Sequence, residues 1–162
     1  MTNKIILLLI ILLCLNGCTR DDICSEETPT TPLLIIVFKD IDNPVNGKNV
    51  SNLTINADYA NDVEVFKGSN TDSIAIPLRT AADSARFRFS SENDQGTFTN
   101  IDLLSFSYQR QDIYVNRACG FKTTYTDLGF ELNTDANNWI LNLEIENQTV
   151  EDETKAHITI LH

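Results

Sequence analysis

The stretch Ala85-Arg86-Phe87-Arg88-Phe89-Ser90 alternates between apolar and polar side chains. Successive side chains of a β-strand point to opposite faces of a sheet, so Ala85, Phe87 and Phe89 would share one face. The two arginines would lie on the opposite face, in contact with water. The pattern predicts a half-buried strand whose aromatic face packs in a core.

The same alternation recurs along the chain, between gaps rich in Asn, Asp and Gly. The other runs place apolar residues at alternate positions: Ile74, Ile76 and Leu78; Leu104, Phe106 and Tyr108; Ile113 and Val115; Trp139, Leu141 and Leu143; Ile158 and Ile160. The continuous apolar run Leu33–Phe38 is typical of a strand buried on both faces. Pro77 lies within its run and favours an edge position or a bulge there. About eight or nine strands at this spacing predict one all-β domain, an antiparallel β-sandwich, with an Ig-like arrangement or a small barrel as alternatives.

Residues 55–65 allow two interpretations. Ala57, Tyr59 and Ala60 could lie in a short helix, whereas Val63, Val65 and the residue after it favour a strand. Strand structure fits the rest of the chain better.

The first eighteen residues contain three distinct segments. Lys4 supplies a positive end, the uncharged apolar run 5–15 follows, and Leu15-Asn16-Gly17-Cys18 ends the segment. The run is shorter than the roughly 20 residues that a membrane-spanning helix needs. The four residues that end the segment, Leu15 to Cys18, resemble the lipobox of bacterial lipoproteins. This resemblance implies acylation of Cys18 and cleavage of the chain just before it. The alternative is a plain secretory signal or a short membrane anchor, with Cys18 incidental.

The lipobox resemblance and the alternating pattern together predict three parts of the chain, and the resemblance also implies a location. Residues 1–17 would be a signal peptide, 18–32 a lipidated flexible tether and 33–162 the β-sandwich domain. The lipid on Cys18 would hold the protein at the outer membrane, on its periplasmic face or at the cell surface. The charged run 19–22 resembles the surface-export signal of Bacteroidota lipoproteins, with a solvated tether as the alternative.

Two of the four cysteines remain available to form a disulfide in the predicted mature chain. Cys14 leaves with the signal peptide and Cys18 carries lipid, so Cys24 and Cys119 remain in an oxidising compartment. Two such thiols most often pair, which predicts a Cys24–Cys119 disulfide. A metal site or a reactive Cys119 are the alternatives.

Little in the sequence points to catalysis. The only histidines are His157, expected at the rim of the last strand, and His162, expected to fray at the chain end. The chain has no nucleophile elbow, phosphate-binding glycine loop or zinc-binding spacing. We therefore expect no enzymatic activity, no cofactor and no metal.

Several polar groups have both a functional and a structural interpretation. The segments 40–43 and 135–137 place Asp and Asn at alternate positions, as calcium loops do, but turn-forming residues do the same. Arg86 and Arg88 form a small basic stripe that suits either a partner or salt bridges to neighbouring strands. Trp139 shares the alternation of Leu141 and is expected in the core.

Composition limits the partners. The chain has 12 Lys and Arg against 23 Asp and Glu, a formal net charge of -11, and 42% hydrophobic residues. This mix suits a globular domain and argues against nucleic acid as a partner, since nucleic acid needs a basic surface.

Short motifs of the mature chain are similar to those of small Bacteroidota lipoproteins of unknown function. They are Cys24 near Thr28-Pro29, the segment 76–80, Cys119-Gly120-Phe121 and the terminal apolar segment 158–161. The resemblance implies no activity, because that family has none assigned. Gly120 after a bridged cysteine suits a turn.

Together these features favour a non-enzymatic envelope lipoprotein that binds a protein partner or has a structural role, marked by an exposed apolar or aromatic patch. The alternative is a surface lipoprotein that binds a glycan or small ligand in a concave site with Tyr or Trp. A hydrolase with facing carboxylates in a cleft is the third interpretation.

Overall fold

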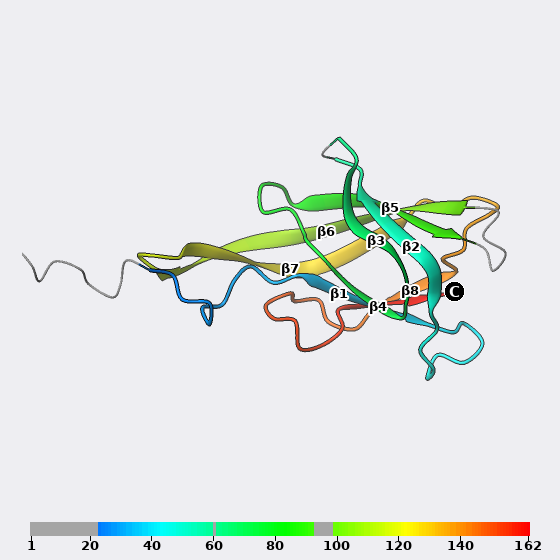
Figure 1. Cartoon of the computed structure of the whole chain (residues 1–162), viewed down its shortest axis with the longest axis horizontal. Helices are drawn as coiled ribbons and strands as arrows, with labels where there is room; N and C mark the ends of the chain where they lie inside the picture. The colour runs from blue at the N-terminus through cyan, green and yellow to red at the C-terminus, as the bar shows by residue number, and fades with distance from the viewer. Residues whose placement is uncertain (1–22, 60, 93–98) are drawn as a thin grey trace, which may run out of the picture. The chain divides into compact units, whose positions relative to one another are not determined.

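The computed structural model describes residues 23–59, 61–92 and 99–162. Within these ranges the chain forms nine strands and no helix (Figure 1). The strands are β1 (Leu34–Lys39), β2 (Val50–Ala57), β3 (Val63–Thr71), β4 (Ser73–Ile76), β5 (Ser84–Glu92), β6 (Thr99–Asn116), β7 (Gly120–Leu132), β8 (Asn142–Ile145) and β9 (Ile158–Leu161). The all-β prediction is confirmed.

The strands form two sheets that pack as a sandwich. One sheet has the order β3-β2-β5-β6-β7, and the other has the order β4-β1-β9-β8. β4 lies at an edge, as the sequence predicted, but it ends at Ile76, so Pro77 follows the strand instead of lying within it.

One pair of strands departs from the antiparallel pattern. β1 and β9 run parallel, with Ile36 opposite Ile158 and Phe38 opposite Ile160. Parallel strands need a long connection, and here most of the domain lies between them in sequence. Local alternation does not encode this pairing.

The helical interpretation of residues 55–65 is wrong. β2 continues to Ala57 and pairs there with Val63, the first residue of β3. Asn61 and Asp62 have φ values of 53° and 64°, in the left-handed region that Asn and Asp tolerate best. These two residues therefore suit the reversal between the strands.

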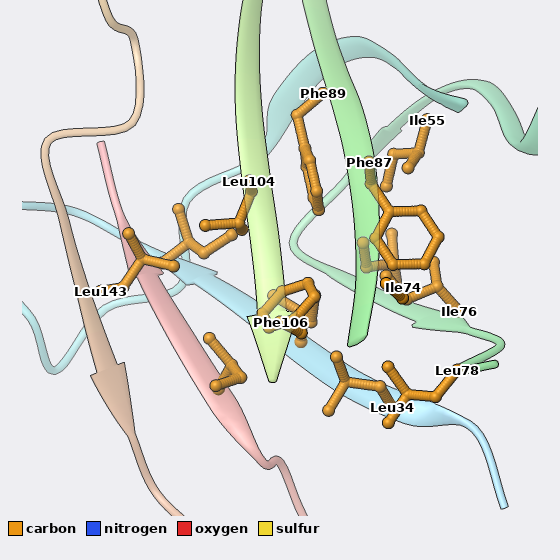
Figure 2. Packing of buried hydrophobic residues seen from close by; sticks show 14 of the residues in the cluster. Leu34, Ile55, Ile74, Ile76, Leu78, Phe87, Phe89, Leu104, Phe106 and Leu143 are labelled. Carbon is orange, nitrogen blue, oxygen red and sulfur yellow. The ribbon is translucent and has the colours of Figure 1, made fainter. Parts of the chain in front are cut away.

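Alternating residues of both sheets fill the core. Phe87 and Phe89 of β5 and Leu104 and Phe106 of β6 are 0% exposed. Figure 2 shows these side chains between the strands of the two sheets, on the side toward Leu34. The alternation used to predict the β5 strand thus identifies its buried face.

The prediction that the first strand is buried on both faces needs correction. In β1, Leu34, Ile36 and Phe38 are buried, but the alternate residues Ile35 and Val37 are only partly buried. The continuous apolar run therefore has one core face and one partly covered face.

The segment before β8 does not alternate as predicted. Ile140 is buried, whereas Leu141 is 58% exposed and Trp139 is half-buried at the core margin. The reason is that Oδ2 of Asp102 accepts a 2.8 Å hydrogen bond from the Ile140 N–H, and this irregular segment turns Ile140 inward. Trp139 Nε1 donates to the Phe89 carbonyl at 3.2 Å.

The chain divides into two compact units. The smaller unit joins the N-terminal segment, up to Thr30, with Ile113–Lys122. The larger contains Thr31–Asp112 and Thr123–His162, and so holds the sandwich. Within it, Thr31 Oγ1 accepts a 3.0 Å hydrogen bond from the Thr123 N–H.

Candidate functional site

The turn between β6 and β7 positions a cysteine. Oδ1 of Asn116 accepts hydrogen bonds from the N–H groups of Ala118 at 2.9 Å and Cys119 at 2.8 Å. Gly120 follows with a φ of 72°, which is accessible because it has no Cβ. Sγ of Cys119 lies 2.04 Å from Sγ of Cys24. The predicted disulfide is confirmed, and neither cysteine is left free to hold a metal or act as a nucleophile.

Cys18 and the whole of the predicted signal peptide, residues 1–17, lie outside the described residues. The part of the predicted tether that the structure describes begins at residue 23. Lipidation therefore stays a prediction from the sequence.

An exposed aromatic pair lies beside the disulfide turn, in the same small unit. Tyr114 of β6 and Phe121 of β7 are 58% and 68% exposed, and their ring centroids lie 5.4 Å apart in an edge-to-face arrangement. Ile113 is also 38% exposed, and Val115 is only half-buried. The expectation that Ile113 and Val115 face a core is wrong, because neither belongs to the buried cluster of the sandwich.

A second candidate site is an open pocket of about 310 Å³ in the larger unit. Tyr59 and Arg79 line it, with the guanidinium carbon of Arg79 4.6 Å from the centre of the Tyr59 ring. Phe87 packs edge-to-face under Tyr59 at 5.8 Å. The remaining lining residues are Asp58, Ser84, Ala85, Arg86 and Ser105.

Hydrogen bonds hold the backbone of this pocket in place. The Arg79 N–H donates to the Tyr108 hydroxyl at 2.9 Å, and that hydroxyl donates to the Arg79 carbonyl at 3.2 Å. The hydroxyl of Tyr125, whose ring lies 5.0 Å from that of Tyr108, donates to the Leu78 carbonyl. The segment before β5 is thus fixed from beneath by two buried tyrosines.

Electrostatics make the pocket polar and mildly cationic. Burial raises the pKa of Tyr59, although the nearby Arg79 charge acts in the opposite direction. Burial also raises the pKa values of Tyr108 and Tyr125 to about 12, so these phenols stay neutral. Two arginines and one aspartate line the pocket, which suits a polar or anionic group better than a cation.

The basic stripe of β5 is paired within its own sheet. Arg86 Nε lies 2.5 Å from Asp58 Oδ2, and Arg88 Nη1 lies 3.0 Å from Asp58 Oδ1. Arg88 also pairs with Asp62. Salt bridging, rather than an open basic surface, accounts for both arginines.

The histidine positions differ from expectation. His157 is 2% exposed and therefore lies inside the fold rather than at its rim. The terminal His162 is held by a 3.2 Å hydrogen bond from its N–H to the Lys39 carbonyl and packs edge-on against Phe38 and Trp139, so it does not fray. Desolvation is the main cause that lowers the pKa of both imidazoles.

The two calcium-like segments form turns. Asp40 Oδ1 accepts from the Asp42 N–H at 3.2 Å, and Asp135 Oδ1 accepts from the Asn137 N–H at 2.6 Å. Within the described residues, no three His, Cys, Asp or Glu side chains lie close enough to hold a metal ion together. The structural interpretation of these segments fits their geometry.

Comparison with known proteins places the chain in a family. A family described as a family of unknown function (DUF6452) matches residues 52–162, which is more than half of the chain. The chain belongs to this family. The DUF6452 match includes the Tyr59 pocket, Cys119 and both exposed aromatic residues of the hairpin, and it assigns none of them a role. No curated protein and no solved structure matches the chain.

No helix able to cross a bilayer is found in the part of the chain that the structure describes.

Sequence reasoning did not predict the Tyr59 pocket. Tyr59 follows β2, Arg79 follows β4, and Ser105 lies within β6, so only the folded sheet brings them together. No spacing in the sequence signals this grouping. The sequence gives only a weak indication of the exposed pair Tyr114 and Phe121, because both residues flank the turn predicted at Gly120.

Proposed function

We propose that this member of the DUF6452 family is a Bacteroidota envelope lipoprotein, anchored by lipid on Cys18 at the outer membrane. In this proposal it is a non-enzymatic module that binds a protein partner or has a structural role. The observation that carries the proposal is the Cys24–Cys119 disulfide. Disulfides persist in oxidising compartments, which supports export by the N-terminal signal.

Three features support the non-enzymatic part of the proposal. The disulfide occupies both cysteines of the mature domain that would not carry lipid. The buried His157 ring accepts a hydrogen bond from a backbone N–H group, and the His162 ring packs against two aromatic rings. The exposed pair Tyr114 and Phe121 is the kind of aromatic patch expected of a contact surface.

The anchor is tested by comparing Cys18→Ser with the matched variant Cys14→Ser in the native host. The wild type and C14S should partition into the detergent phase of a membrane extract and float with outer-membrane vesicles in a density gradient. C18S should appear in the aqueous phase. A C18S protein that stays in the detergent phase would refute lipidation at this residue.

The partner is tested by cross-linking in intact cells followed by purification of the lipidated protein. A specific envelope protein should be recovered with the wild type and lost when the cross-linker is omitted. Recovery of the protein alone at every cross-linker concentration would count against partner binding and leave a structural role.

The Tyr59 pocket favours a second candidate function, the binding of a glycan or small ligand. It combines an aromatic ring, a cation and two hydroxyl side chains in one concavity, which is the composition expected of such a site. Titration with uronic-acid and neutral oligosaccharides should show saturable binding that R79A weakens and L141A leaves unchanged. The absence of binding to either class would eliminate this candidate.

A further inference from the structure

We propose that the disulfide-linked end of the β6–β7 hairpin contacts the lipid bilayer through Tyr114 and Phe121, in the headgroup region of the membrane that holds Cys18. This inference rests on the proposed lipidation of Cys18. It adds a second, non-covalent contact and gives the aromatic pair a specific occupant, a lipid surface.

The first argument is the exposure of the pair. Phe121 is 68% exposed and Tyr114 is 58% exposed, yet the two rings lie edge-to-face at 5.4 Å and form one continuous aromatic surface. Exposed apolar surface is unfavourable in water, so an apolar neighbour would stabilise it. Ile113, itself 38% exposed, extends the same stretch of β6.

The second argument is the distance to the anchor. Cys119 is bonded to Cys24, and Cys24 is only the sixth residue after Cys18. An extended chain spans at most about 3.3–3.6 Å per residue, so the lipidated residue cannot lie more than about 20 Å from the disulfide. Phe121 follows Cys119 by two residues. The aromatic pair is therefore kept close to the bilayer surface whatever the rest of the domain does.

The third argument is the chemistry of the hairpin end. Tyr is enriched at membrane–water interfaces, where its ring contacts acyl chains and its hydroxyl meets the headgroups. Phe is common on the apolar face of segments that lie in this interface. Arg117 and Lys122 flank the turn, and neither takes part in an ion pair among the described residues. Their charges suit lipid phosphates. Glu26 and Glu27 are exposed in the same unit and oppose deep insertion, so the contact is shallow.

The test places a fluorescent reporter at the hairpin end of the full lipidated protein. F121W is compared with V63W, a substitution at a similarly exposed strand position, since Val63 is 52% exposed. The signal of Trp139 is measured in the wild type and subtracted. All three proteins are reconstituted in phosphatidylethanolamine–phosphatidylglycerol vesicles that contain brominated phosphatidylcholine.

The proposal expects a blue-shifted F121W emission that brominated lipid quenches, and a V63W emission that it does not quench. Equal quenching of the two positions, or equal accessibility of both to aqueous iodide, would overturn it. Shielding of F121W that needs added outer-membrane protein, without quenching by bromolipid, would also overturn it and indicate a protein partner. A protein that fails to float with the vesicles at all would instead contradict lipidation of Cys18, so the two failures are distinguishable.

A second measurement needs no fluorescent substitution. Trypsin should cleave at Arg117 and Lys122 more slowly in vesicles than in detergent micelles with the wild type. The variant F121S should lose most of this difference. An F121S variant as protected by vesicles as the wild type would contradict the contact.

Discussion

Nδ1 of His157 accepts a 3.0 Å hydrogen bond from the backbone N–H of Ile35. The backbone N–H of His157 in turn donates to the Ile35 carbonyl at 2.9 Å. One residue thus satisfies both backbone polar groups of Ile35, just where β1 and β9 begin their parallel pairing. The accepting role requires Nδ1 to be unprotonated.

This contact predicts a pH dependence of stability. Burial lowers the pKa of His157 in the folded state, although Asp152 and Glu153 act in the opposite direction. A lowered pKa means that the unfolded chain takes up the proton first, so the free energy of unfolding falls as pH falls below about 6.5. Urea unfolding at pH 7.5, 6.5 and 5.5 should show this decline, and H157Q should reduce it. Because the pKa of His162 is also lowered, H162Q is the control that separates the two. An identical pH profile in H157Q and the wild type would contradict the prediction.

The disulfide predicts a large effect of reduction. Cys24 and Cys119 are 95 residues apart in sequence, and closing so long a loop restricts the unfolded chain. The chain-entropy argument expects that C119S or a reductant lowers the free energy of unfolding by about 4–5 kcal/mol. Urea unfolding with and without reductant measures it, and C24S should match C119S. Equal stability with and without reductant would show that the bridge adds nothing to the fold.

Truncation of two neighbouring residues of β5 should lower the free energy of unfolding by very different amounts. Phe87 is 0% exposed among core aromatic residues, so F87A leaves a cavity and should lower the free energy of unfolding by about 3–5 kcal/mol. Arg86 lies on the exposed face in an ion pair with Asp58, and such surface pairs contribute less than about 1 kcal/mol. R86A is therefore the matched control, measured in the same urea series. Similar losses for both variants would contradict the assignment of the two faces.

The alternation that predicts this contrast explains why so much of the sandwich could be foreseen. A period of two requires only that one face is apolar, so it identified the buried residues of β4 and β5 without any knowledge of their partners. In β9 the alternation named Ile158 and Ile160, but Thr159 and Leu161 are buried as well. The disulfide was also predictable, because the lipobox resemblance predicts loss of Cys14 and lipidation of Cys18, which would leave only Cys24 and Cys119 to pair.

The sequence-based predictions that were wrong or missing share a physical cause, namely contacts between residues far apart in sequence. Asp102 holds the Ile140 N–H across the sandwich, and this contact breaks the alternation expected for Trp139 and Leu141. The parallel pairing of β1 with β9 buries His157, which sequence position alone would place at an edge. The Tyr59 pocket likewise depends on the order of strands in its sheet.

Asp102 is a buried carboxylate with only one hydrogen-bonded oxygen, so its charge and its acceptor can be tested separately. It is 1% exposed; Oδ2 accepts from the Ile140 N–H, and Oδ1 has no partner among the described residues. Desolvation raises the pKa of Asp102, although the hydrogen bond from Ile140 acts in the opposite direction. A raised pKa means that the ionisation of Asp102 in the folded state becomes destabilising as pH rises.

The variant D102N keeps an acceptor for the Ile140 N–H without the charge, so it should be at least as stable as the wild type at pH 8. D102L removes the acceptor and should lose about 1–3 kcal/mol, because the Ile140 N–H stays buried and unpaired. Urea unfolding at pH 8 measures both, and a D102N variant as unstable as D102L would show that the charge itself holds the segment.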